Sequence, residues 1–462
     1  MTLGFLLGIA VPWAIGALTL RLVWPLAGAG SFLNLLRVTL GFFLGAGIVS
    51  VQMVLALLIF GSLDHRLPLM ELGTLGLLTI LNLMRRVPSE PSSEGESIPT
   101  MVMTVVGFAL LGLVLEVLET RSRAFPHGGW DAWSIWNARA RFLYLGEAEW
   151  RTGFCIEAEA GHPDYPLLLM GMVCQLWCWV GEASERAAAS LGIVSTVMTS
   201  ALVLGAVGAL RGGFVGWIAF AAWFGSWNLL RRSYEQCADI PMSACCIGSV
   251  VLLEFSRTRP EKVVLAGLSG AFASAAAWTK NEGIVFALVM LATVTVTAWR
   301  RLWAFAMGAA PFGSVLLWFK LNLAPANDLV VATSGESLLN RLTDVSRIGK
   351  VGEAFATELL RFGEPMSTWP ALSIGMLPIL IVAAIRGIWW TRPAERRQAA
   401  VALAVFMVMA VAYFVVYVLT PKDLEWHLNS SLDRLVIQIW PVAILGLCLC
   451  LPGRRDNAPE GA

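Results

Sequence analysis

Long runs of apolar residues, separated by short polar connections, follow one another along the whole chain. A helix that crosses a bilayer needs about 20 consecutive apolar residues, and most of these runs approach that length. The pattern therefore predicts an all-α, polytopic transmembrane helical bundle of about thirteen spans. The expected spans are residues 1–20, 38–60, 67–84, 101–118, 187–210, 213–230, 237–255, 263–279, 282–298, 302–321, 372–390, 399–420 and 435–452.

One apolar run is too short to cross the bilayer as a helix. It extends from Leu167 to Val180, about 14 residues, or roughly 21 Å as a helix. It follows the polar signature Gly161-His162-Pro163-Asp164-Tyr165-Pro166. We interpret the run as interfacial or re-entrant, which keeps the loop 119–186 on one side of the membrane as a module with interfacial helices.

Basic residues in short loops mark the cytoplasmic side of membrane proteins. One topology places all the major basic loops there, provided that the short run does not span. This topology puts the N-terminus outside, and residues 1–20 lack the basic start of a secretory signal, so we expect a retained first helix. The basic loops contain Arg85, Arg86, Arg257, Arg259, Lys262, Arg300, Arg301, Arg392, Arg396, Arg397, Arg454 and Arg455.

Composition shifts divide the chain further. A stretch rich in Ser, Pro and Glu is typical of a flexible linker. Apolar residues recur every three or four positions from Leu338 to Leu359, which predicts an amphipathic helix on the membrane surface or over a site. The expected units are an N-terminal extension (1–84), a cytoplasmic linker (85–100), a catalytic module (101–321), an external loop (322–371), C-terminal helices (372–452) and a cytoplasmic tail (453–462).

Composition supports the membrane assignment. Hydrophobic residues make up 57% of the chain, charged residues 14%, and the mean hydropathy is +0.70. A net charge of +1 gives no reason to expect nucleic acid as a partner. The eight cysteines show no metal or disulfide spacing, and most lie in apolar runs, where cysteine acts as a small hydrophobe.

Many charged and histidine residues near the ends of the apolar runs lie on the same side of the membrane in this topology. Charged and histidine residues from loops far apart in sequence all fall on the external side, which predicts that they meet in a site. Some are basic and oppose the positive-inside trend, as expected for binding a lipid-linked phosphate or pyrophosphate; the alternative is that they reach toward lipid headgroups. The external set is His65, His127, Asp131, His162, Asp164, Arg231, Arg232, Glu235, Asp239, Lys280, Glu282, Lys422, Asp423, Glu425, His427, Asp433 and Arg434.

Several sequence segments that contain residues of this external set resemble segments of a known family. Over roughly residues 101–452 the chain resembles bacterial polytopic glycosyltransferases of the GT-C superfamily, distant relatives of protein O-mannosyltransferases and of the transferases that put aminoarabinose on lipid A. The blocks are Trp130-Asp131-Ala132-Trp133-Ser134-Ile135-Trp136-Asn137, His162-Pro163-Asp164-Tyr165-Pro166, Glu235-Gln236-Cys237-Ala238-Asp239, Ala277-Trp278-Thr279-Lys280-Asn281-Glu282-Gly283 and Trp426-His427-Leu428-Asn429-Ser430-Ser431-Leu432-Asp433-Arg434-Leu435.

The resemblance implies a bacterial inner-membrane enzyme with an extracytoplasmic site, a catalytic acid at Asp131 and a polyprenyl-phosphate sugar as donor. Two departures limit it. Many relatives have a second acidic residue beside the catalytic one, whereas Ala132 follows here, so metal use stays open and a divalent cation is an expectation only. The acidic loop also follows the fourth expected helix rather than the first, and residues 1–84 receive no role.

The chemistry of such a transfer can be derived from the residues. A lipid phosphate is a weakly basic leaving group that needs positive charge rather than a general acid. We expect donor phosphate binding by Lys280, Arg232, Arg434 or His427. The acceptor hydroxyl, on a glycan, lipid or protein, loses a proton as it attacks, and Asp131 is the candidate base. One base with direct displacement predicts inversion at the anomeric carbon. His162, Asp164, Asp239 and Glu282 are the candidate substrate-binding residues.

Each assignment has a structural alternative. Asp131 could cap a helix at 132–144, and Asp239, two residues before Pro241, fits a helix start. His162 and Asp164 lie in a Pro-flanked turn, and Lys280 could simply pair with Glu282. The tryptophans at 130, 133 and 136 fit an interfacial belt better than a platform for sugar stacking.

Two other functions remain open. A polytopic transporter or lipid-linked glycan flippase would suit many spans, although transporters concentrate ionisable residues near mid-membrane. A polymerase or ligase of lipid-linked glycans would share the outer-face site and differ in using an oligosaccharide donor.

Overall fold

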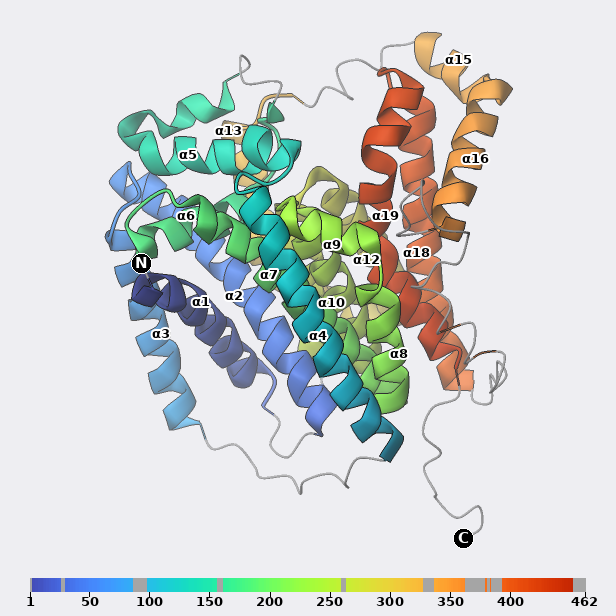
Figure 1. Ribbon diagram of the computed structural model, residues 1–462, viewed down its shortest axis with the longest axis horizontal. Coiled ribbons are helices and arrows are strands. Elements are labelled where there is room, and N and C mark those ends of the chain that lie inside the picture. Colours follow the sequence, from blue (N-terminus) through green and yellow to red (C-terminus); the bar gives the residue numbers. More distant parts are fainter. Residues whose placement is uncertain are drawn as a thin grey trace.

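The computed structural model describes residues 2–25, 30–85, 98–155, 161–258, 263–326, 336–361 and 393–451, together with Ile379 and Ala383. These residues form helices and connecting turns, and no strand occurs among them (Figure 1). The helices are α1 (Thr2–Val23), α2 (Ser31–Phe60), α3 (Arg66–Met84), α4 (Ile98–Ala124), η1 (Ala132–Trp136), α5 (Asn137–Leu145), η2 (Glu147–Phe154), α6 (Leu168–Val180), α7 (Glu185–Arg211), α8 (Gly213–Phe224), α9 (Trp227–Tyr234), α10 (Asp239–Thr258), α11 (Val264–Thr279), α12 (Asn281–Ala298), η4 (Trp299–Arg301), α13 (Leu302–Asn322), α15 (Glu336–Thr343), α16 (Val345–Arg361), α18 (Pro393–Leu419) and α19 (Leu424–Leu449).

Within the described ranges, nine helical stretches are long and apolar enough to cross a membrane, or ten if the bent pair α8 and α9 forms one span. The all-α, multi-pass prediction is therefore confirmed at this level, but the figure of about thirteen spans is not. The axes of α8 and α9 differ by 62°, and α11 has 16 residues, too few for a straight crossing. The expected span 372–390 lies almost wholly outside the described residues, as do most of the linker 85–100 and the tail 453–462.

One of the nine stretches, the 42 residues from Asn281 to Asn322, is a helical hairpin. Lys320, near the end of α13, donates a 2.7 Å hydrogen bond from Nζ to Oδ1 of Asn281, the first residue of α12. A straight helix of this length would separate its ends by roughly 60 Å, so the chain must reverse direction. It does so at the short helix η4, and both ends of the hairpin lie at the same end of the bundle.

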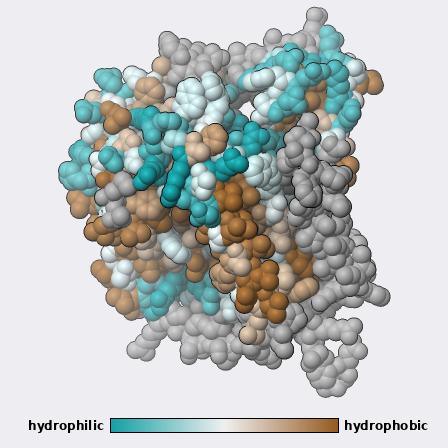
Figure 2. Space-filling view, in the orientation of Figure 1, coloured by the Kyte–Doolittle hydropathy of each residue, from teal (hydrophilic) through white to brown (hydrophobic). Residues whose placement is uncertain are grey.

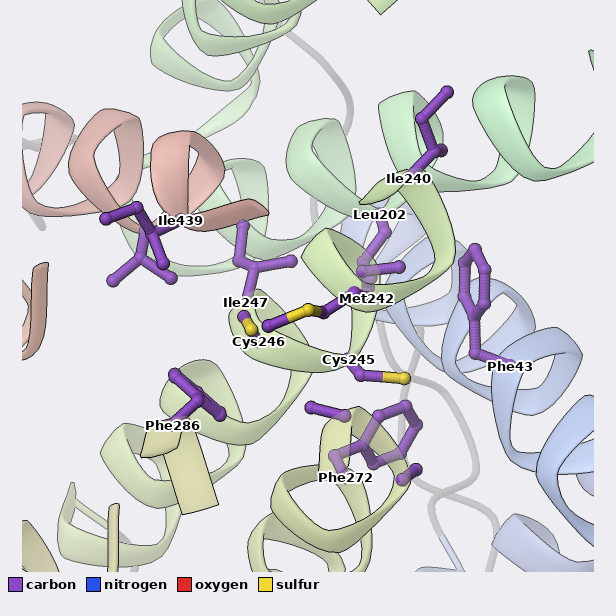
Figure 3. Close-up of a cluster of buried hydrophobic side chains, with 14 of the residues drawn as sticks. Phe43, Leu202, Ile240, Met242, Cys245, Cys246, Ile247, Phe272, Phe286 and Ile439 are labelled. Carbon is purple, nitrogen blue, oxygen red and sulfur yellow. The ribbon is translucent and has the colours of Figure 1, made fainter. Parts of the chain in front are cut away.

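α10 occupies the centre of the bundle. Its most apolar window is completely buried. Figure 3 shows side chains of α10, among them Met242 and Ile247, lying between Phe43 of α2, Phe272 of α11 and Ile439 of α19. Because protein interiors are close-packed, a helix enclosed on every side is held firmly in place. The first residues of α10 are therefore held in a defined position.

The N-terminal extension is packed into this bundle. α1 and α2 cross closely, since a Cβ added at Gly16 would lie only 1.9 Å from the backbone oxygen of Gly41. In α3, the buried carboxylate of Glu71 accepts hydrogen bonds from Nε1 of Trp179 at 2.7 Å and Nε2 of Gln175 at 3.3 Å. Residues 1–84 thus support α6.

Short helices gather at one end of the bundle. Figure 1 shows α5 and α6 running across the steeper helices, and Figure 2 shows hydrophilic residues at the same end of the visible face. α6 has 13 residues, which agrees with the prediction of a segment too short to span. The amphipathic helix expected in the loop 322–371 is present as α15 and α16, and α16 buries Val351 and Phe355.

Candidate functional site

Four charged side chains from distant parts of the chain form a continuous chain of ion pairs where the short helices gather. Arg434 of α19 contacts the carboxylates of Asp131, just before η1, and of Asp239, the first residue of α10. Lys280, between α11 and α12, donates a 2.8 Å hydrogen bond to Asp239. We call Asp131, Asp239, Lys280 and Arg434 the charged cluster. The structure brings these four predicted site residues together.

Asp239 is the centre of the charged cluster. It is completely buried and accepts bonds from Lys280, from Nε2 of Gln438 at 2.6 Å and from Nε of Arg434 at 3.4 Å. A buried carboxylate is strongly unfavourable unless it is paired in this way. Lys280, only 2% exposed, also contacts Glu282 at 3.2 Å. The Lys280–Glu282 pair anticipated as a structural alternative therefore exists, but it belongs to the buried network.

Asp131 is positioned by the turn before it. Gly128 has φ +74°, and a Cβ there would lie 2.8 Å from the backbone oxygen of Glu235. The backbone N–H of Gly129 donates to the same oxygen at 3.1 Å. The Asp131 carboxylate makes no helix-capping bond and contacts Arg434 instead. The helix it precedes begins as a π-helical turn, a feature frequent at functional sites.

A second group of ion pairs lies beside the charged cluster. Arg232 of α9 contacts Asp433, the neighbour of Arg434 on α19, and binds Oε2 of Glu235 at 2.5 Å. Glu235 also accepts a 2.8 Å bond from Arg231. Arg232, predicted to bind a donor phosphate, is therefore already paired with two carboxylates.

The loop containing His162 and Asp164 is tied to the same end. Arg139 of α5 donates a 2.8 Å bond to the backbone oxygen of His162, which has φ +47°, rare for a non-glycine residue. Asp164 accepts a 2.6 Å bond from Nδ2 of Asn281, and Lys320 donates to its backbone oxygen at 2.5 Å. The α12–α13 hairpin thus holds this loop against the start of α12.

Tyr165 connects that loop to the charged cluster. Its ring stacks on His162 and on Trp136, with centroids 5.1 and 5.4 Å apart, and Nζ of Lys280 lies 5.7 Å from its centroid. Burial, with Glu282 nearby, raises the pKa of Tyr165 well above its usual value. The hydroxyl therefore stays protonated at neutral pH and can donate a hydrogen bond.

The three tryptophans of the first block have different surroundings. Trp130 and Trp133 are 64% and 51% exposed and contact each other edge to face. Trp136 is completely buried. The first two fit the interfacial belt expected for them, whereas Trp136 is part of the wall of the site.

His427 is more remote. Its Nδ1 lies 2.9 Å from Oγ1 of Thr420, and its ring is 4.8 Å from that of Tyr417. It precedes Arg434 by two turns on α19, about 10 Å along the axis. Of the predicted phosphate-binding residues, Lys280 and Arg434 both contact Asp239, and Arg232 pairs with Asp433, the neighbour of Arg434.

Several buried polar atoms near the charged cluster have no hydrogen-bond partner within the described part of the chain. They are Oε2 of Glu282, an acceptor, and two donors, Nε1 of Trp136 and Nε of Arg232. Buried polar atoms are normally satisfied by protein, water or a ligand. A ligand with several hydroxyl groups could satisfy both kinds, since a hydroxyl both donates and accepts.

The cations in the charged cluster are balanced by carboxylates, and Arg434 lies between the two aspartates. No group of three or more His, Cys, Asp or Glu side chains that could hold a metal ion occurs in the described ranges. The expected divalent cation therefore gains no ligand set here. The eight cysteines are all free thiols, and burial raises the pKa of Cys237, beside the charged cluster, to about 12.

Some residues of the site were not predicted from the sequence. Gln438 follows Arg434 by one helical turn, a spacing that places both on one face of α19, and this was an available signal. No local sequence pattern predicts the roles of Tyr165, Asn281 and Lys320, because these roles depend on how helices far apart in sequence pack.

Together, the helices and the charged cluster define a multi-pass helical membrane protein with a buried ionic site at one end. No family model, curated protein or solved structure matches the chain.

Proposed function

We propose that the protein is a membrane glycosyltransferase that moves a monosaccharide from a polyprenyl-phosphate donor to an acceptor hydroxyl on the extracytoplasmic side. The proposal rests on the charged cluster, in which the partly exposed side chains of Asp131 and Arg434 share one site with the buried cation of Lys280. The side chain of Asp131 is 16% exposed, whereas that of Asp239 is not exposed at all. Asp131 can therefore reach a substrate, and Asp239 holds the cations in place.

Lys280 and Arg434 would stabilise the negative charge of the phosphate as it leaves the sugar. Lys280 has three N–H donors, and its ion pairs with Asp239 and Glu282 engage two of them. Arg434 has five N–H donors and uses its Nε and Nη2 nitrogens for the two aspartates. Donors that remain can face a phosphate as its bond to the sugar breaks. Preorganised charge of this kind lowers the barrier because it needs no rearrangement during the reaction.

Asp131 is the proposed general base. Its contact with Arg434 orients the carboxylate, which would accept the proton of the acceptor hydroxyl during attack. With one base and direct displacement, the anomeric configuration inverts. Glu282 and Trp136, with their unsatisfied polar atoms, would bind sugar hydroxyls. The loop of His162 and Asp164 would form the adjoining wall.

The orientation is supported by the two ends of α10. It begins at Asp239, in the site, and its last turn contains Arg257. Arg300 and Arg301 lie at the same far end, in the reversal between α12 and α13. Because basic loops favour the cytoplasmic side, the site would face outward.

The test supplies purified protein in liposomes with two donors, a polyprenyl monophosphate sugar and a polyprenyl pyrophosphate oligosaccharide. Release of polyprenyl phosphate with transfer of one sugar supports the proposal. Transfer of whole oligosaccharides would identify a polymerase or ligase instead. Movement of intact donor across the membrane without bond cleavage would identify a flippase.

A further inference from the structure

A second charged site lies at the far end of α10, away from the charged cluster. A cavity of about 410 Å³ opens between the last turn of α10, the reversal at η4 and the start of α18. Its charged and amide-bearing lining residues are Glu254, Arg257, Arg300, Arg301, Arg397 and Gln398. We call this the arginine cavity.

The arginine cavity is strongly positive. Among the lining residues that the structure describes, four arginines against one glutamate give a formal charge of +3. Arg257 pairs with Glu254 at 2.6 Å, and Arg301 donates to Oγ of Ser256 at 2.7 Å. Arg300 lies over the ring of Trp299. Among the side chains that the structure describes, no carboxylate forms an ion pair with Arg300 or Arg397. Such a cavity favours an anion, and guanidinium groups match phosphate oxygens well.

The floor of the cavity adds a second requirement. Glu254 is completely buried, and its Oε2 has no hydrogen-bond partner in the described part of the chain. A buried acceptor of this kind needs a donor from water or a ligand. The best ligand therefore combines a phosphate, for the arginines, with a hydroxyl or other donor, for Glu254.

The surroundings favour a lipid over a free phosphate. Large apolar side chains are exposed beside the cavity: Trp299 (67%), Trp303 (61%) and Val296 (83%). Tryptophan at the end of a membrane helix lies at headgroup level, and exposed aliphatic residues below it contact acyl chains. Basic pockets between helices on the cytoplasmic side bind anionic lipid headgroups.

We propose that the arginine cavity binds the headgroup of an anionic phospholipid whose phosphate carries hydroxyl groups, in the leaflet opposite the charged cluster. The phosphate lies among Arg300, Arg397 and Arg257, and a headgroup hydroxyl donates to Glu254. The acyl chains lie along the exposed surface of α12 and α13. This binding is independent of the proposed transfer reaction.

The test measures lipid binding to the full chain by native mass spectrometry, with phosphatidylglycerol, phosphatidylethanolamine and inorganic phosphate as probes. Phosphatidylglycerol should bind most tightly, and the double variant R300Q/R397Q should weaken it by on the order of tenfold. The matched control is R121Q/R123Q, which removes two exposed arginines at the opposite end of the bundle and should leave binding unchanged. Melting temperatures without added lipid confirm that each variant is folded.

A second variant, E254Q, tests the role of Glu254 at the floor of the arginine cavity. E254Q should reduce the preference for phosphatidylglycerol over phosphatidic acid, whose phosphate carries no hydroxyl-bearing group. Equal phosphatidylglycerol binding by wild type and R300Q/R397Q would overturn the proposal. Binding of inorganic phosphate that displaces phosphatidylglycerol at equal concentration would assign the cavity to a soluble anion and overturn the lipid assignment.

Discussion

The guanidinium of Arg434 pairs with the carboxylate of Asp131, a residue 303 positions earlier in the chain. The same guanidinium reaches Asp239, so one side chain of α19 joins the segment before η1 to the start of α10. A fork with five donors in one plane is suited to binding two carboxylates at once. The two aspartates nevertheless differ in exposure, and this difference separates their expected roles.

Replacing Asp131 with asparagine should abolish sugar transfer while leaving the protein folded. The amide cannot accept the proton of the acceptor hydroxyl, and general base catalysis typically contributes about 10²–10⁴-fold. The measurement is transfer from a polyprenyl monophosphate sugar in liposomes. The matched control is D64N, since Asp64 pairs with Arg66 on the surface. Full activity in D131N membranes would eliminate Asp131 as the base.

Removing the Lys280 cation should destabilise the protein strongly, because its partner Asp239 is buried. K280M leaves Asp239 buried without one of its two cations, and breaking a buried ion pair costs about 3–5 kcal/mol. The double variant D239N/K280M should lose less than the sum of the single variants, because neither charge is then left alone. Denaturant unfolding in detergent gives the four free energies. Strict additivity would show that the pair is not coupled.

Gly128 should tolerate no side chain, although other glycines with similar backbone angles do. G128A places a Cβ 2.6 Å from that of Ala132 and 2.8 Å from the Glu235 oxygen, so the turn before Asp131 must move. Gly181 also has positive φ, at +86°, but has open space around it. G128A should therefore reduce both melting temperature and transfer, and G181A should show only the smaller cost of strained backbone. Equal effects in both variants would contradict the crowding argument.

Much of this arrangement could be predicted, and the missing parts have physical reasons. Lipid disfavours charged residues, so those at the ends of apolar runs, such as Asp131, Asp239 and Arg434, are recognisable in the sequence. The number of spans does not follow from run length alone, since run length does not show that α8 and α9 differ in direction by 62°. Contacts such as Lys320 with Asn281 depend on which helices become neighbours, and periodicity within one helix does not contain that information.

Glu358 should make stability depend on pH. It lies in α16, accepts a 3.4 Å bond from Asn228, and burial, with Asp433 nearby, raises its pKa to about 7. Because the folded state holds this proton more tightly than the unfolded chain, its stabilising contribution is present below about 4.5 and is lost as pH rises through about 7.

The measurement is the melting temperature of wild type and E358Q from pH 4.5 to 8. The variant, which cannot ionise at this position, should gain relative to wild type as pH increases. Using the difference between the two proteins removes the contributions of other carboxylates. A constant difference across the range would show that Glu358 does not titrate there.

The long separation between Arg434 and its partners has a consequence for biosynthesis. A ribosome adds about 5–20 residues per second, so roughly 15–60 s pass between the emergence of Asp131 and that of Arg434. Until Arg434 is made, Asp131 lacks this partner and Asp239 has at most one of its two cations, Lys280. We expect chains released before α19 to be degraded faster than complete ones, and pulse-chase labelling of a truncation before Leu424 would measure it.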